Sequence, residues 1–121
     1  MMLLQNNFYS IQACAQTDNM IEARIAINAT HEIFKGHFPD RPVVPGVCMV
    51  QISKELAEKC IQQHLRIAEI SQIKYLKPII PEENQYIQVH ISLKDELNFN
   101  ATWTLGQETA MKMNGKWHII S

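Results

Sequence analysis

The sequence predicts an α+β fold in which one long helix lies against an antiparallel sheet of roughly six strands. Three segments alternate apolar and polar residues with period two, which is typical of strands that bury one face. A further segment, from Val47 to about His64, contains no glycine or proline and repeats its apolar residues with a helical period. A length of 121 residues suits one domain, and we expect a single domain over residues 1–121.

The three clear strands are predicted at 21–27, 87–93 and 97–105. The apolar residues expected to face the core are Ile21, Ala23, Ile25 and Ile27, then Ile87, Val89, Ile91 and Leu93, then Leu97, Phe99, Ala101, Trp103 and Leu105. Asp95-Glu96 and Gly106-Gln107 are breaks of hairpin size. Weaker alternation predicts further strands at 8–15, 67–76 and 109–113, which brings the sheet to about six.

The predicted helix has a wide apolar arc and a narrow polar stripe. At 100° per residue, the arc collects Met49, Val50, Ile52, Leu56, Ala57, Cys60 and Ile61, with Ser53 as its one polar member. The stripe on the opposite side consists of Gln51, Glu55, Glu58 and Gln62. An arc of this width suits a helix laid against a curved sheet, so we expect the helix to be central.

Composition argues against several classes of protein. The net charge is −1, whereas a chain that binds nucleic acid through phosphates is normally basic. Three cysteines without a CxxC pair favour neither a disulfide framework nor a zinc site and are typical of a reducing compartment. The opening residues lack the features of a signal peptide, and no apolar run approaches the ~20 residues that span a bilayer. We therefore expect a cytoplasmic protein with no nucleic-acid or membrane partner.

One loop before the helix combines features that favour chemistry. Residues 34–46 hold three prolines and two glycines in 13 residues, so the loop is stiff. His37 lies in it, and an imidazole with an ordinary pKa of about 6.5 can act as a base near neutral pH. The helix that begins after Pro45-Gly46 offers N–H groups and partial positive charge to an enolate. The alternative is that His37 only caps a turn in a structural loop.

The run Gly36-His37-Phe38-Pro39-Asp40-Arg41-Pro42-Val43-Val44-Pro45-Gly46-Val47 resembles the signature of the hotdog-fold 3-hydroxyacyl-ACP dehydratases, where ACP is acyl carrier protein. That signature reads roughly G-H-F-P-x-x-P-x-x-P-G-V, and every fixed position is present. The resemblance extends over about residues 8–113 and implies a long helix wrapped by an antiparallel sheet, which the periodicity predicts independently. The chain also resembles small dehydratase-like proteins of pigment-type polyene pathways.

The resemblance implies a role for each matched residue. His37 would take the α-proton of a 3-hydroxyacyl thioester, and the backbone N–H of Gly46 would bind the thioester carbonyl. Phe38, Pro45 and Val47 would lie beside the acyl chain. Members of the family act on acyl thioesters of acyl carrier protein and work as dimers whose sites use both subunits. Since an elimination next to a carbonyl needs only a base, an acid and an oxyanion site, we expect no cofactor and no metal.

One position departs from the family pattern. The family keeps Asp or Glu fourteen residues after the histidine, where this chain has Gln51. An amide cannot transfer a proton at useful pH, and loss of general acid catalysis typically costs ~10²–10⁴ in rate. Many members carry Gln one turn later, and here that place is Glu55, about 5.4 Å along the helix. The two residue types are exchanged along the stripe, and we expect Glu58 and Gln62 to be ordinary surface.

Three explanations of Gln51 stay open, beside the simple alternative of a solvated helix stripe. Glu55 or a water orders the hydroxyl and dehydration proceeds; or the pocket hydrolyses acyl thioesters, with Gln51 positioning them; or the chain is a non-catalytic half that pairs with a complete paralogue. The favoured function is dehydration of 3-hydroxyacyl-ACP to the trans-2-enoyl thioester in fatty-acid or polyene-type synthesis. The alternatives are a thioesterase or an acyl-ACP-binding subunit, in a homodimer or heterodimer.

Two smaller predictions concern charge and cysteine. Lys35, Arg41, Lys74 and Lys77 lie in or beside the loops expected at the pocket mouth, where they would steer an acidic carrier protein or simply form a solvated face. Cys48 follows the helix start, and its position on the wheel favours a packed core thiol over an activated one.

Overall fold

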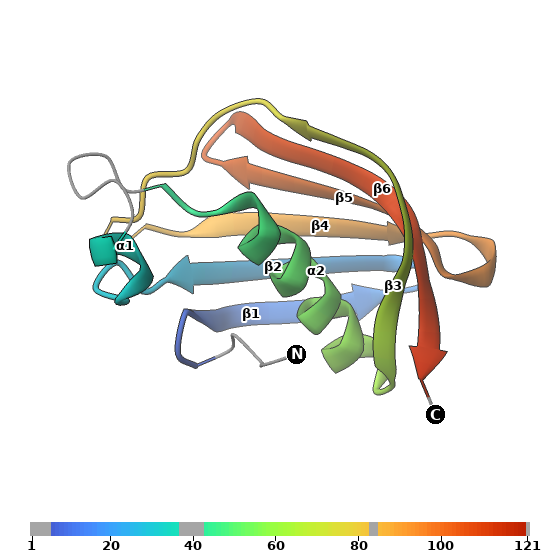
Figure 1. Cartoon of the computed structure of the whole chain (residues 1–121). Helices are drawn as coiled ribbons and strands as arrows, with labels where there is room; N and C mark the ends of the chain where they lie inside the picture. Colours follow the sequence, from blue (N-terminus) through green and yellow to red (C-terminus); the bar gives the residue numbers. More distant parts are fainter. Residues whose placement is uncertain (1–5, 37–42, 83–84, 121) are drawn as a thin grey trace.

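The computed structural model describes residues 6–36, 43–82 and 85–120, where a six-stranded antiparallel sheet curves around one long helix (Figure 1). The strands are β1 (Tyr9–Thr17), β2 (Met20–Ile27), β3 (His64–Tyr75), β4 (Ile87–Leu93), β5 (Asn98–Leu105) and β6 (Glu108–Ile120). The helical segments are α1 (Ile33–Gly36), α2 (Gly46–Ile61) and the 3-10 turn η1 (Asp95–Leu97). The sheet order is β1-β2-β4-β5-β6-β3, so the predicted α+β hotdog arrangement is confirmed.

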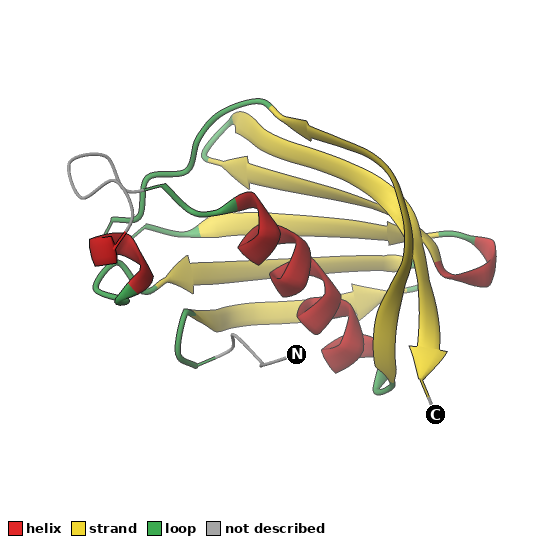
Figure 2. Ribbon diagram, viewed as in Figure 1, coloured by secondary structure: helices red, strands yellow, loops and turns green. Residues whose placement is uncertain are grey.

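The period-two alternation explains which face of the sheet meets the helix. Ile21 and Ile25 on β2 and Ile87 and Ile91 on β4 are fully buried. The alternate residues, such as Glu22, Arg24 and Gln88, are exposed. Figure 2 shows α2 lying across the inner face of the curved sheet. No helix in the described ranges combines the length and apolar character needed to cross a membrane.

The helix ends earlier than predicted. It was expected to continue to about His64, but α2 ends at Ile61 and Gln62 adopts the left-handed conformation (φ 61°), with its N–H donating to the Glu58 carbonyl at 2.8 Å. The Glu58 carboxylate also accepts the Leu65 N–H at 2.7 Å, which binds the start of β3 to the last turns of the helix. A side-chain contact to the next strand therefore determines the end of α2.

The last strand is much longer than predicted. Alternation indicated residues 109–113, but β6 continues to Ile120 because β5 lies on one side of it and β3 on the other. Gly115 lies within this strand, and a Cβ there would overlap the backbone of Glu69 and Ile70. Bulges in β3 lie on either side of the same point. Glycine and bulges together allow the sheet to bend sharply over α2.

Ser53, the polar member of the apolar arc, has a specific place in the core. Its hydroxyl donates to the Met49 carbonyl at 2.9 Å and accepts the indole N–H of Trp103 at 3.0 Å. Ser53 and Trp103 are both fully buried. The serine thus supplies the acceptor that a buried indole N–H requires.

Candidate active site

The start of α2 is held between the two proline-bearing loops. The Val44 N–H donates to the Ile79 carbonyl at 2.8 Å, so the loop before α2 is joined to the loop after β3. Gly46 then begins the helix in direct contact with Tyr75, and a Cβ at Gly46 would overlap the phenol ring. The absence of a side chain at Gly46 lets the Tyr75 ring lie against the backbone of the helix start.

The first donors of α2 are not used by the helix. The Pro45 carbonyl accepts hydrogen bonds from the N–H groups of Cys48 (3.0 Å) and Met49 (3.2 Å). The N–H groups of Gly46 and Val47 precede these two, so the helix offers them no carbonyl acceptor one turn earlier. No side chain caps this end of the helix. Two N–H groups at the positive end of the helix dipole can therefore bind a carbonyl that becomes negatively charged.

The first two residues of the polar stripe are buried rather than solvated. Gln51 is 6% exposed and Glu55 is 5% exposed. Gln51 Nε2 donates to Glu55 Oε2 at 2.8 Å, and the Tyr9 hydroxyl on β1 donates to Glu55 Oε1 at 3.1 Å. Gln51 Oε1 is buried and accepts no hydrogen bond from the described residues. The arrangement leaves one amide acceptor in a buried place, which a ligand with an O–H or N–H group can satisfy.

Tyr9 belongs to this group, although the sequence prediction gave it no role. Burial raises the pKa of the Tyr9 phenol well above its usual range, and the charge and hydrogen bond of Glu55 raise it further. Tyr9 is therefore a permanent donor to the carboxylate at ordinary pH. The sequence carried only a weak signal for it, a hydroxyl-bearing aromatic in a predicted strand 46 residues from its partner.

Not every predicted site residue lies within the described part of the chain. His37 and Phe38 are outside it. Pro45, Gly46 and Val47 form the helix start, and the Val47 side chain is 77% exposed. Nothing in the described chain therefore covers the side chain predicted to line an acyl channel.

Exposed apolar side chains gather around that helix start. Gly46 contacts Tyr75, and Val44 is bonded to Ile79, so the neighbours of these residues lie close together. The exposed members, which we call the apolar patch, are Val43, Val47, Tyr75, Leu76 and Ile80. Large exposed apolar patches are typical of surfaces that bind another molecule.

Two other expectations on α2 have different outcomes. Glu58 was expected to be ordinary surface, and this is wrong: its side chain is 15% exposed and it bonds Lys54 as well as the N–H of Leu65. Gln62 is exposed, as expected. Cys48 is buried, and burial raises the pKa of its thiol, which confirms the packed core cysteine.

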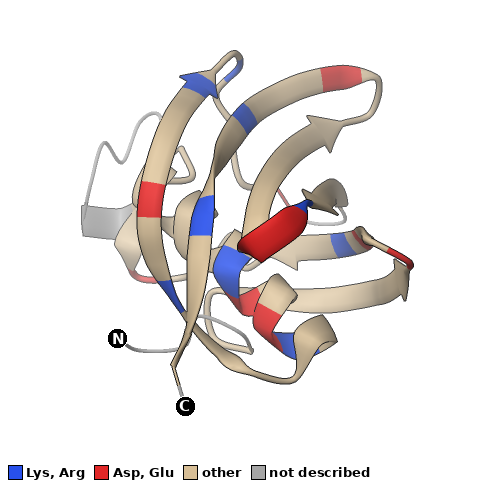
Figure 3. Cartoon of the chain, turned by 90° about the vertical axis from the view of Figure 1, so that its right-hand side faces the viewer, with Lys and Arg blue, Asp and Glu red and all other residues tan. Residues whose placement is uncertain are grey.

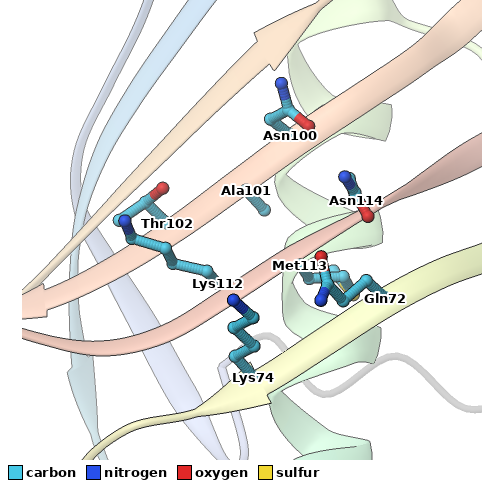
Figure 4. A pocket seen from close by; sticks show the side chains of 8 residues that line it. All are labelled: Gln72, Lys74, Asn100, Ala101, Thr102, Lys112, Met113 and Asn114. Carbon is cyan, nitrogen blue, oxygen red and sulfur yellow. The ribbon is translucent and has the colours of Figure 1, made fainter.

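The predicted basic group is not a uniform patch. Lys77 bonds Glu108 at 2.6 Å, while Lys74 lies opposite Lys112 on the outer face of the sheet. Lys74 and Lys112 line a hollow of about 300 Å³ together with Asn100 and Asn114 (Figure 4). Basic and acidic positions are interspersed in Figure 3. Arg41 lies outside the described residues, and in the part that is described no three His, Cys, Asp or Glu side chains gather around a possible metal.

Solved structures of similar shape have the same fold. The dehydratase heterocomplex ApeI:P from Xenorhabdus doucetiae matches with a TM-score of 0.77 at 20% identity, over 88% of this chain and 95% of the other. The PaaI protein of E. coli, from the phenylacetic acid degradation operon, matches with a TM-score of 0.65 at 12% identity, over 93% of this chain and 80% of the other. At these sequence identities, the structural similarity concerns the fold alone.

Sequence comparison bears on the family. The 3-hydroxyacyl-[acyl-carrier-protein] dehydratase FabZ of Ehrlichia canis is 26% identical over 92 residues, which are 68% of this chain and 62% of the relative. The FabZ of Rickettsia africae is 31% identical over 87 residues, 64% of this chain and 60% of the relative. The chain thus spans about three fifths of the length of these relatives. The family model described as ApeI dehydratase matches residues 13–116. The chain therefore belongs to the ApeI-like dehydratase family.

Proposed function

We propose that this chain removes water from 3-hydroxyacyl thioesters carried by acyl carrier protein and forms trans-2-enoyl thioesters. The observation that carries the proposal is that α2 begins at Gly46, within the last residues of the family motif, with N–H groups outside the helix ladder. The Gly46 N–H binds the thioester oxygen, and the helix dipole stabilises the charge that develops there. His37 removes the α-proton, and Phe38, Pro45 and Val47 lie along the acyl chain.

The proton balance of this reaction is compatible with a single base. Dehydration removes an α-hydrogen and a β-hydroxyl, which together make one water. Because an amide at Gln51 cannot supply a proton, His37 returns the proton that it removed to the departing hydroxyl. One histidine then closes the cycle without a second acid and without a cofactor.

Gln51 acts in this scheme as a fixed acceptor. One N–H of its amide is held by Glu55, so the amide oxygen points away from the carboxylate. That oxygen accepts the hydrogen of the substrate hydroxyl and orients the C–O bond for elimination. Tyr9 and Gln51 each donate to one oxygen of Glu55, which makes Glu55 a positioning residue rather than the acid.

The first experiment follows a 3-hydroxyacyl-ACP substrate by mass spectrometry. Loss of water reports dehydration, and release of a free acid reports the thioesterase alternative. We expect dehydration by the wild type and its loss in His37→Ala, with exposed His64→Ala as the matched control. Unchanged dehydration in His37→Ala would contradict the proposed base.

A second experiment reverses the exchange along α2. The double variant Gln51→Glu/Glu55→Gln restores an acid at the family position and keeps one carboxyl and one amide in the buried pair. If His37 carries the proton alone in the wild type, the added acid raises the rate by about 10²-fold or more. Gln63→Glu, on an exposed residue, is the control for a carboxyl added outside the site. If wild type and double variant are both inert, dehydration by this chain alone is abandoned.

The second candidate function is that of one subunit in a two-chain dehydratase. The missing carboxyl at Gln51 favours it, as does the apolar patch around the helix start. The structure of ApeI:P, similar in fold, is a dehydratase heterocomplex. We propose that a related hotdog subunit, either a second copy or a paralogue, covers the patch and completes the channel at Val47.

The partner proposal is tested by association in solution. Val47→Asp places a charge in the centre of the apolar patch, so we expect it to shift sedimentation velocity towards the single chain. Ile120→Asp is the control, since Ile120 is exposed at the far end of β6. Equal assembly of both variants would contradict the assignment of the patch. Recovery of activity on adding a paralogue distinguishes a heterodimer from a homodimer.

A further inference from the structure

Two cysteines meet where the last turn of α2 lies against β1. Cys14 Sγ and Cys60 Sγ are 3.3 Å apart, and neither is in a disulfide. Both side chains are partly exposed, whereas Cys48 is buried. The chain holds three cysteines, so this pair contains every thiol that solvent can reach. Its place at the end of α2 is remote from Gly46 at the beginning of the helix (Figure 1).

A β-bulge directs Cys14 towards the helix. Before the bulge, Tyr9 and Ile11 pair with the buried residues Ile27 and Ile25 of β2. The register shifts between Ile11 and Ala13, after which Cys14 pairs with buried Ala23. Directly paired residues of antiparallel strands point to the same face, so Cys14 faces α2. Without the extra residue, period two would turn its side chain outward.

The helix presents Cys60 to the same place. Ile52, Leu56 and Cys60 are spaced four residues apart and lie along one face of α2. The first two are fully buried under the sheet, and Cys60 continues their row to the rim of the core. The strand bulge and the helical repeat thus bring together two thiols that are 46 residues apart in the chain.

We propose that Cys14 and Cys60 are a modification site at which hydrogen peroxide forms an intramolecular disulfide between β1 and α2. Cys14 sulfur attacks one peroxide oxygen, the O–O bond breaks, and a sulfenic acid and one water form. Cys60 sulfur then attacks Cys14 Sγ and expels the hydroxyl, which leaves as a second water with the Cys60 proton. Two thiols lose two electrons in total, and one peroxide is reduced to two waters.

The environment assigns the order of these steps. Burial and the contact with Cys14 raise the pKa of Cys60 to about 12, and Lys59 opposes this only in part. Cys60 therefore remains a thiol near neutral pH, in contact with Cys14 Sγ. Cys14 is therefore the thiol that reacts first with the oxidant, and Cys60 is the resolving thiol beside it.

The test uses the full chain, reduced and then treated with hydrogen peroxide. Free thiols are afterwards blocked with iodoacetamide under denaturing conditions and counted by intact mass. Reduced protein accepts three labels, and oxidised protein is expected to accept one, at Cys48, with loss of two hydrogen atoms. Peptide mapping should give a peptide linked through Cys14 and Cys60, which dithiothreitol separates. The cross-link should raise Tm by about 10 °C.

The variants separate this pair from general oxidation. Cys14→Ser and Cys60→Ser should each abolish the linked peptide, with the corresponding alanine variants as replacements if serine impairs folding. Cys48→Ala is the control and should keep the linked peptide. Sulfinic acid at Cys14 without a cross-link, a cross-link between two chains only, or a cross-link that needs Cys48 would overturn the proposal. None of these readouts depends on the dehydratase activity.

Discussion

The two ends of α2 differ in how their polar groups are satisfied. From Gln51 onward, donors meet acceptors within the chain: Gln51 and Tyr9 bond Glu55, and Glu58 bonds the start of β3. At Gly46 and Val47, helix donors stand outside the ladder and apolar side chains are exposed. The closed part holds the fold together, and the open start is suited to binding another molecule.

The contrast also explains how a buried carboxylate is tolerated. A buried charge is costly unless it is hydrogen-bonded, and each oxygen of Glu55 accepts a bond from a side chain of the described core. The same bonds orient the Gln51 amide, whose oxygen remains for a ligand. The hydrogen bonds to Glu55 thereby determine which atom of Gln51 is left for a ligand.

The largest effect is expected from Glu55→Ala, which breaks the closed part. Removal of the carboxylate leaves the Tyr9 hydroxyl and the Gln51 amide buried without their acceptor. At about 1–3 kcal/mol for each unsatisfied group, we expect a loss of about 3 kcal/mol or more in the free energy of unfolding, measured by urea denaturation. The exposed Glu32→Ala should change it by no more than about 0.5 kcal/mol. Equal effects of the two variants would remove the distinction between the regions.

Ser53→Ala tests a second buried contact of the same helix. The variant leaves the indole N–H of Trp103 without its acceptor, so we expect a loss of about 1–3 kcal/mol in unfolding free energy. The exposed Ser71→Ala is the matched control. A loss no greater than that of the control would mean that Trp103 does not depend on Ser53.

Tyr9→Phe is expected to cost about 1 kcal/mol near neutral pH, since it removes one hydrogen bond to Glu55. The pH dependence is more specific. The folded chain raises the pKa of Tyr9 above its ordinary value of 10.0, so the contribution of Tyr9 to stability is complete below pH 10 and falls as the pH rises further. The slope is about 1.4 kcal/mol per pH unit for one proton. In Tyr9→Phe, the free energy of unfolding should fall less steeply above pH 10 than in the wild type, as measured by denaturation curves at several pH values. An equally steep fall in both proteins would contradict the role of Tyr9.

The smallest effect on folding is expected from Val47→Ser at the open start. Val47 is 77% exposed, so the free energy of unfolding of the single chain should change by no more than about 0.5 kcal/mol. Association should nevertheless weaken if the apolar patch is covered by a second subunit, which sedimentation velocity measures. A marked loss of stability at low protein concentration would show that Val47 already packs within its own chain.

The predictable part of the molecule was the part with regular periodicity. The strands at 21–27, 87–93 and 97–105 and the start of the helix follow the predicted positions within a residue or two, because one buried face repeats along each. The length of β6 did not follow, because its second partner, β3, lies far away in sequence. The end of α2 did not follow, because the bond between Glu58 and the N–H of Leu65 leaves no trace in the helical period. At the candidate site, Gly46 and Gln51 were predicted from the resemblance, whereas Tyr9 had only a weak signal, a hydroxyl-bearing aromatic in a predicted strand.

By itself the sequence determined the fold class and the family, since these depend on residue order and spacing. Only the tertiary structure decided that Gln51 and Glu55 are buried, because a helical wheel gives the direction of a side chain and not what lies there. It also decided that Cys14 faces Cys60, because one bulge reverses the direction of every later side chain in β1. Both are facts about contacts between distant segments, which local patterns do not contain.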